Sequence, residues 1–187
     1  MTNEINKAIE ILKVGGVILY PTDTIWGIGC DATNENAVAK IYEIKKRNDA
    51  KSMIILLDNL NKIYSYSDAV PDIALDIIEM ANNPTTVIFS EAKNLAKNLI
   101  NKDGSIAIRV AQDEFCKKLI QRFKKPIVST SANVSGEFSP QNFSEISEEI
   151  KNNVDFITNL FHNKKEKNKP SGIIKVGKNN EISIIRE

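Results

Sequence analysis

The sequence contains few of the side chains on which nucleophilic, redox and zinc enzymes depend. It has two cysteines and one histidine in 187 residues. Cys30 and Cys116 are far apart in the chain and form no Cys-x-x-Cys motif, so we interpret them as small buried side chains in a reducing environment. His162 lies in a lysine-rich stretch with no evident serine or carboxylate partner. This pattern argues against a Ser-His-Asp hydrolase and against a zinc site.

Long apolar runs and a strong net charge are also absent. No run of about 18 apolar residues occurs, so no membrane span is expected. Residues 1–6 contain no basic stretch followed by an apolar segment, so no secretory signal is expected either, and we expect a cytoplasmic protein. The formal net charge is +1. This value argues against a chain built as a nucleic-acid clamp but is compatible with a local basic groove.

Length and composition are typical of one globular domain. The chain has 42% hydrophobic and 26% charged residues, which are ordinary values for a soluble protein. A chain of 187 residues is long enough for one complete core, and a second domain is not expected. We therefore predict a single domain over residues 1–187.

Helical and extended patterns alternate along the chain. Apolar residues three and four positions apart predict helices over 3–13, 34–46, 71–80, 113–123 and 144–151, with Asn34 as an N-cap. Apolar runs rich in β-branched residues predict strands over 17–20, 53–57, 85–89, 105–110, 126–130, 154–158, 171–176 and 182–185. This alternation indicates an α/β fold with a twisted sheet flanked by helices. The closely spaced strands near the C-terminus favour a mixed sheet over a wholly parallel one.

Polar side chains gather at the ends of three predicted strands. Strand 126–130 leads into Ser-Ala-Asn-Val-Ser-Gly, and strand 17–20 leads into Pro-Thr-Asp-Thr-Ile-Trp-Gly. Arg109 lies near the end of strand 105–110. Ligands of open α/β sheets bind at the carboxyl ends of strands. We therefore expect a small polar or anionic ligand to be held over the sheet.

Arginine is used sparingly in this lysine-rich sequence. Of 25 basic residues only four are arginines, namely Arg47, Arg109, Arg122 and Arg186. The first, second and fourth lie beside candidate site segments, whereas Arg122 lies in a predicted helix. The planar guanidinium binds carboxylates and phosphates in a way that lysine cannot copy. Any one of these arginines could form an ordinary surface ion pair, but three of four beside site segments favours a binding role.

A second basic cluster, Lys45, Arg47 and Lys51, lies at the end of the predicted helix 34–46. It is either a group that faces phosphates or a solvated turn whose charges suit the helix dipole. The sequence has no Gly-x-x-x-x-Gly-Lys-Ser/Thr loop. Residues 27–32 match a Gly-x-Gly-x-x-Ala pattern by letter only, because residues from Pro21 onward separate them from the strand end. Cations and hydroxyls without a nucleophile–base pair suit phosphoryl or nucleotidyl transfer.

Five motifs, in order along nearly the whole chain, resemble those of the YrdC-like family. They are Pro21-Thr-Asp-Thr-Ile-Trp-Gly with Asp31-Ala32, Lys45-Lys-Arg47-x-x-x-Lys51, Ser105-Ile-Ala-Ile-Arg109, Ser129-Thr-Ser131-Ala-Asn133-Val-Ser135-Gly136, and Ser139-Pro140. The combination is highly specific. The resemblance implies a single-domain, twisted mixed sheet flanked by helices, with a concave basic groove.

The resemblance also implies a reaction. The family joins L-threonine, bicarbonate and ATP into threonylcarbamoyl-adenylate and releases pyrophosphate. Mg²⁺ would be held mainly through the ATP phosphates, with no metal ligands from the protein. A threonylcarbamoyltransferase complex then uses the product to modify tRNA, and weak direct tRNA binding is compatible with the groove.

Site residues are assigned by matching the family motifs. The threonine-binding positions are Thr24, Arg109 and Ser129. The ATP-binding positions are Arg47, Lys51, Ser105, Ser131, Asn133, Ser139 and Arg186. The residues expected to act in catalysis are Lys45, Arg47 and Arg109.

One departure from the family pattern affects the threonine site. Gly172 stands where relatives have threonine or glutamate after Pro-Ser, so we expect a looser pocket wall at this position. Two alternatives remain open at the level of sequence. One is an RNA-binding module, for which phosphate-driven binding with steep salt dependence would be diagnostic. The other is a paralogue of the same fold with a different substrate.

Overall fold

The structure is a computed structural model that describes residues 1–46, 53–162, 169–177 and 179–187. Its helices are α1 (Thr2–Lys13), α2 (Glu35–Ile44), α3 (Asp72–Met80), α4 (Glu114–Phe123) and α5 (Glu148–Asn153). Its strands are β1 (Ile18–Tyr20), β2 (Gly27–Gly29), β3 (Ile54–Leu57), β4 (Ser67–Ala69), β5 (Thr85–Ala92), β6 (Ile106–Val110), β7 (Ile127–Ser131), β8 (Phe156–Ile157), β9 (Gly172–Val176) and β10 (Ile182–Arg186). Short 3-10 helices cover Leu60–Ser65, Lys97–Leu99 and Phe143–Glu145.

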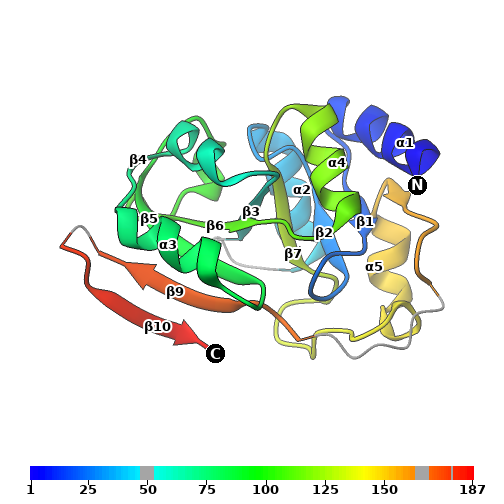
Figure 1. Cartoon of the computed structure of the whole chain (residues 1–187). Coiled ribbons are helices and arrows are strands. Elements are labelled where there is room, and N and C mark those ends of the chain that lie inside the picture. Colours follow the sequence, from blue (N-terminus) through cyan, green and yellow to red (C-terminus); the bar gives the residue numbers. More distant parts are fainter. Residues whose placement is uncertain (47–52, 163–168, 178) are drawn as a thin grey trace.

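The strands form one mixed sheet, which confirms the predicted fold class (Figure 1). Their order is β10-β9-β5-β6-β3-β7-β2-β1-β8, and β4 pairs with β5 outside this path. The pairs β1–β8, β3–β6 and β5–β9 are parallel, and the remaining pairs are antiparallel. β6 and β7 both border β3, but β6 runs parallel to it and β7 antiparallel. The carboxyl ends of β6 and β7 therefore point in opposite directions.

Helices cover both faces of this sheet. The apolar stripe of α1 (Ile5, Ala8, Ile9 and Leu12) packs with α4 and with Ile18 and Tyr20 of β1 in one cluster. Leu19, between those two residues of β1, belongs to a second cluster that includes side chains of α2, α3 and α5. Side chains alternate between the faces of a strand. The helices α1 and α4 thus cover one face, where Figure 1 shows them side by side, and the other helices cover the opposite face.

The predicted elements correspond closely to the observed ones. Asn34 is the N-cap of α2, and its side-chain oxygen accepts from the N–H groups of Asn36 and Ala37. The main difference among the helices is α5, which begins at Glu148 because a 3-10 turn precedes it. None of the described helices has the length and apolarity that crossing a bilayer requires.

β2 was not predicted, because its sequence is Gly-Ile-Gly and glycine disfavours strands. It lies between β1 and β7 and pairs antiparallel with both. A Cβ at Gly29 would lie 2.4 Å from the carbonyl oxygen of Val128 and 2.7 Å from Tyr20 Cε1. The glycine is therefore needed for close packing within the sheet. This finding gives the Gly-x-Gly pattern a structural role.

Candidate functional site

A cavity of about 200 Å³ lies over the face of the sheet that α1 and α4 partly cover. Arg109 on β6 and Ile127 on β7 are both register partners of Leu56, so the three side chains point to one face. Leu56 and Ile127 pack in the cluster of α1 and α4. The cavity is lined by Thr24, Ile25, Trp26, Gly27, Met53, Ile54, Arg109, Ser129, Thr130, Ser131, Ser139, Pro170, Ser171, Ile173 and Arg186.

A ligand was expected over the sheet, held by polar residues at the ends of strands. The cavity does lie over the sheet, but β6 and β7 run in opposite directions, so their carboxyl ends do not share one edge. Arg109 and Ser129 instead meet over the face of the sheet, two register positions apart along β3. The sequence predicted which strands contribute, and their antiparallel arrangement places the cavity above them.

The charged side chains among the described lining residues are both basic. Arg109 and Arg186 are the charged residues among the described lining residues, which include no carboxylate. Six of the lining residues carry hydroxyl groups, namely Thr24, Ser129, Thr130, Ser131, Ser139 and Ser171. Partial desolvation of its guanidinium and the nearby Arg109 charge both lower the pKa of Arg186. Two guanidinium groups that influence each other and are surrounded by hydroxyls suit a carboxylate or phosphate ligand.

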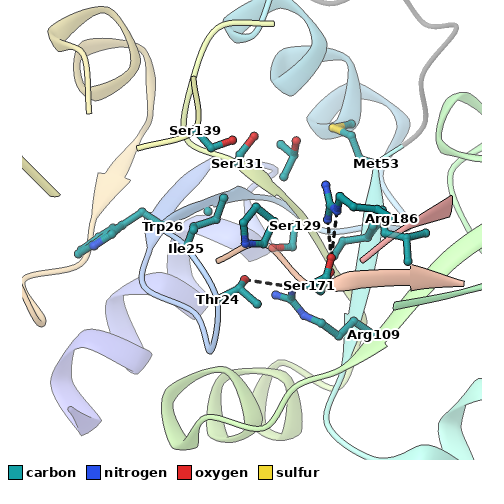
Figure 2. A pocket seen from close by; sticks show the side chains of 15 residues that line it. Thr24, Ile25, Trp26, Met53, Arg109, Ser129, Ser131, Ser139, Ser171 and Arg186 are labelled. Atoms are coloured by element: carbon teal, nitrogen blue, oxygen red, sulfur yellow. Dashed lines mark hydrogen bonds between the residues drawn. The ribbon is translucent and has the colours of Figure 1, made fainter. Parts of the chain in front are cut away.

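Arg109 is held in place by two consecutive residues. It is 3% exposed, and its Nη1 donates to Thr24 Oγ1 at 3.1 Å, as Figure 2 shows. Its Nη2 lies 3.2 Å from Asp23 Oδ1. The other carboxylate oxygen of Asp23 accepts from the backbone N–H of Gln112 at 2.9 Å. The orientation of the guanidinium is therefore fixed by the protein itself.

Arg186 reaches the cavity from the outermost strand, β10. Its Nε and Nη2 donate to the carbonyl oxygen of Ser171 at 3.0 and 2.8 Å (Figure 2). The hydroxyls of Ser171 and Thr86 lie 2.8 Å apart. Sequence reasoning assigned no role to Ser171. The one sequence feature that could have indicated it is its position directly before β9, which pairs with β5.

Gly172 does not line the cavity, and a Cβ there would meet only the Arg186 carbonyl oxygen, at 3.6 Å. The expected gap in the pocket wall therefore does not occur at this residue.

Ser129 and Ser131 are alternate residues of β7, so they share one face. Both line the cavity, as does Ser139 from the following loop (Figure 2). A Cβ at Gly27 would lie 3.2 Å from Ser129 Oγ. A side chain on β2 would therefore crowd the hydroxyl that was predicted to bind threonine.

Lys45 and Asn133 support the loop that follows β7. Lys45 is 2% exposed, and its Nζ donates to the carbonyl oxygens of Ser131 and Asn133 at 2.5 and 2.6 Å. The side-chain amide of Asn133 donates to the carbonyl oxygens of Val134 and Glu137 at 3.0 and 2.8 Å. Neither side chain lines the cavity. Lys45 and Asn133 therefore hold the backbone that carries the serines at the end of β7 and in the loop after it.

One further predicted ATP-binding residue in the described part of the chain, Ser105, lies away from the cavity. Ser105 precedes Arg109 by four residues, or about 13 Å along an extended strand, and it does not line the cavity. Its Oγ donates to Asp103 Oδ1 at 2.6 Å, and this bond lowers the pKa of Asp103. Arg47 and Lys51 lie outside the described residues.

Trp26, the aromatic residue among the described lining residues of the cavity, belongs to a cluster of three rings. Trp26 is 6% exposed and contacts the rings of Phe143 and His162, with centroid distances of 5.0 and 5.5 Å. The rings of Phe143 and His162 stack at 3.7 Å. His162 Nε2 lies 2.7 Å from the carbonyl oxygen of Thr158, so this nitrogen donates. The histidine therefore packs in the ring cluster of Trp26, and its described contacts are not those of a catalytic triad.

Comparisons with known proteins agree with this architecture. Threonylcarbamoyl-AMP synthase of Pseudoalteromonas translucida is 41% identical over 136 residues, which cover 71% of this chain and 73% of that protein. The structure of E. coli YciO matches with a TM-score of 0.86 and 27% identity, covering 100% of this chain and 90% of that one. P. abyssi Sua5 complexed with L-threonine matches with a TM-score of 0.81 and 24% identity, covering 91% of this chain and 50% of that one.

The Sua5 chain is therefore about twice as long as the part that this chain matches, and its likeness concerns the fold. A family model named Sua5/YciO/YrdC, with the description "telomere recombination", matches residues 10–187. The match extends from α1 to the last strand and includes every residue that lines the cavity. The chain belongs to the Sua5/YciO/YrdC family.

Proposed function

We propose that this protein is an L-threonylcarbamoyladenylate synthase, a nucleotidyltransferase that uses L-threonine, bicarbonate and ATP. The 41% identical relative has the name threonylcarbamoyl-AMP synthase, and the matched Sua5 structure contains L-threonine. The observation on which the proposal depends is the oriented guanidinium of Arg109, in a cavity whose described lining includes no carboxylate. Such a group is suited to hold the carboxylate of an amino acid.

The size of the cavity supports an amino acid as its enclosed ligand. Its volume is about 200 Å³, below the range of about 300–1,000 Å³ that is usual for pockets of drug-sized ligands. ATP is larger than threonine and would extend from this cavity past Ser131, Ser139 and Arg186. The ATP-binding roles of Arg47, Lys51, Ser105 and Asn133 stay predictions.

The chemistry requires two bond-forming steps. The threonine nitrogen bonds to the carbon of bicarbonate, and one water is lost. A carbamate oxygen of the resulting N-carboxythreonine then attacks the α-phosphorus of ATP, and pyrophosphate leaves with its bonding electrons. In this scheme Arg109, Thr24 and Ser129 hold threonine, while Arg186 and the loop hydroxyls contact the nucleotide. The rate would come from positioning and charge stabilisation, as in other phosphoryl transfers.

Magnesium would enter with ATP as part of the substrate. The described residues contain no group of three or more His, Cys, Asp or Glu side chains able to hold a metal ion. The hydroxyls and guanidiniums of the cavity fit a nucleotide whose phosphates already hold the cation. This arrangement is usual for Mg²⁺, which keeps few protein ligands.

The product suggests the next protein in the sequence of reactions. A mixed anhydride of a carbamate and AMP is reactive, so we propose that a tRNA-modifying threonylcarbamoyltransferase complex consumes it. This role implies a cytoplasmic location. Weak direct binding of tRNA to a basic groove remains part of the proposal.

The test is pyrophosphate release measured with each substrate omitted in turn. We expect release only when ATP, Mg²⁺, L-threonine and bicarbonate are all present. Equal release without threonine would contradict the proposal and favour a paralogue with another acceptor. Absence of turnover together with strongly salt-dependent RNA binding would favour an RNA-binding module.

A further inference from the structure

Asp23 lies behind the wall of the cavity rather than in it. Its carboxylate does not line the cavity of Arg109 but a neighbouring cavity of about 330 Å³, which Asp113 and Glu114 also line. Its side chain is 7% exposed, and that of Arg109 is 4% exposed. Asp23 is therefore placed to act on a ligand of the first cavity without lining that cavity, through its contact with Arg109 and through its charge.

The contacts of Asp23 constrain the guanidinium from one side. Oδ1 lies 3.2 Å from Arg109 Nη2, and Oδ2 accepts from the backbone N–H of Gln112. Thr24, the next residue, accepts from Nη1 of the same arginine at 3.1 Å. Two adjacent residues of one loop thus contact both terminal nitrogens of Arg109, which fixes the plane of the guanidinium before a ligand arrives.

Asp23 also contributes to the charge of the site. Arg109 and Arg186 are close enough for the charge of Arg109 to lower the pKa of Arg186. The negative charge of Asp23 offsets one of these two positive charges from outside the cavity. Without this charge, an anion that needs no particular geometry, such as sulfate, would be attracted more strongly. A carboxylate that depends on the oriented fork of Arg109 would lose contacts because the arginine would be less ordered.

We infer that Asp23 is a positioning residue that orients Arg109 for the carboxylate of the amino-acid substrate and limits the attraction of the site for other anions. This inference rests on the proposed role of Arg109 in binding threonine. A buried ion pair is by itself weak evidence for a contribution to stability. The inference assigns the Asp23–Arg109 pair a role in substrate specificity instead.

The test compares three variants of the full-length chain. Asp23→Asn removes the charge and keeps the shape, whereas Asp23→Glu keeps the charge on a longer side chain. Asp31→Asn is a matched control, because Asp31 is also buried, pairs with Lys125 at 2.6 Å and accepts from the backbone N–H of Thr33. Asp31 does not line the cavity of Arg109.

We expect Asp23→Asn to raise the KM for L-threonine about tenfold, while the KM for ATP, a polyanion, stays equal or falls. Asp23→Glu should recover most of this loss. Asp31→Asn should lower the urea midpoint while the KM values stay unchanged. An unchanged threonine KM in Asp23→Asn, or equal increases in Asp23→Asn and Asp31→Asn, would overturn the inference.

A second measurement requires no turnover. The only tryptophan of the chain, Trp26, lines the cavity, so its fluorescence can report binding of inorganic sulfate. We expect sulfate to bind Asp23→Asn several-fold more tightly than the wild type, and weaker or equal binding would contradict the charge argument. If the wild type shows no threonine-dependent pyrophosphate release, the proposed function fails, while this titration still tests the ion pair.

Discussion

Replacement of Arg109 by lysine is the most direct test of the cavity. The substitution keeps the positive charge but removes the planar fork that contacts Thr24 on one side and Asp23 on the other. A lysine ammonium carries its three donors on a single nitrogen. It would have to divide them between these protein partners and the substrate carboxylate, and it cannot offer the carboxylate two parallel N–H groups. We therefore expect a large loss of threonine binding from a substitution that is usually called conservative.

The magnitude follows from the contacts that are lost. A hydrogen bond to a charged group contributes about 1.5–3 kcal/mol, and each 1.4 kcal/mol corresponds to about tenfold in affinity. Loss of one such bond to the substrate would raise the threonine KM roughly 10- to 150-fold. The assay is pyrophosphate release at saturating ATP and bicarbonate with threonine varied.

Arg122→Lys provides the matched control. Arg122 lies exposed in the last turn of α4 and does not line the cavity. It should leave the threonine KM unchanged, since lysine serves equally well near a helix C-terminus. Equal behaviour of the two variants would refute the assignment of Arg109 to the site, as would a normal threonine KM in Arg109→Lys.

Two further predictions concern stability. Gly29→Ala should destabilise the fold by about 1–3 kcal/mol, because the new Cβ would overlap the Val128 carbonyl. Gly172→Ala should change stability by less than about 0.5 kcal/mol. Urea unfolding of both variants checks this prediction, and equal unfolding midpoints would contradict it. Burial raises the pKa of Asp113, so its ionised form weakens the fold as pH rises through the folded pKa. Asp113→Asn keeps the N-cap to Cys116 and should be at least as stable as the wild type at neutral pH, with the difference shrinking in acid; a less stable variant at neutral pH would show that the attraction of Arg109 outweighs burial.

Much of the fold was predictable because its signals are local. Periodic apolar residues and an N-cap at Asn34 located the helices, and β-branched runs located most strands. β2 and β4 could not be found in this way. Gly-Ile-Gly and Ser-Asp-Ala have low strand propensity, and they become strands only because β7, β1 and β5 supply partners.

The candidate site was predictable where family motifs name a residue and less so where geometry decides. Thr24, Arg109, Ser129, Ser131, Ser139 and Arg186 all line one cavity. Ser105 shares a motif with Arg109, but four residues of extended chain separate the two side chains. The roles of Ser171 and Asp23 were identified only from the contacts that they make with Arg186 and Arg109 in the structure. Such contacts join residues far apart in sequence, and no local pattern encodes them.

Because Arg186 lies on β10, ligand binding in the cavity is linked to whether this outermost strand is docked on the sheet. β10 pairs only with β9 among the described strands, and all five of its residues are exposed. Strands held in this way open at a lower free energy than central ones. The affinity of the cavity for a ligand that requires Arg186 therefore scales with the fraction of molecules in which β10 is docked. By the same linkage, a ligand that bridges Arg109 and Arg186 would hold the outermost strand on the sheet.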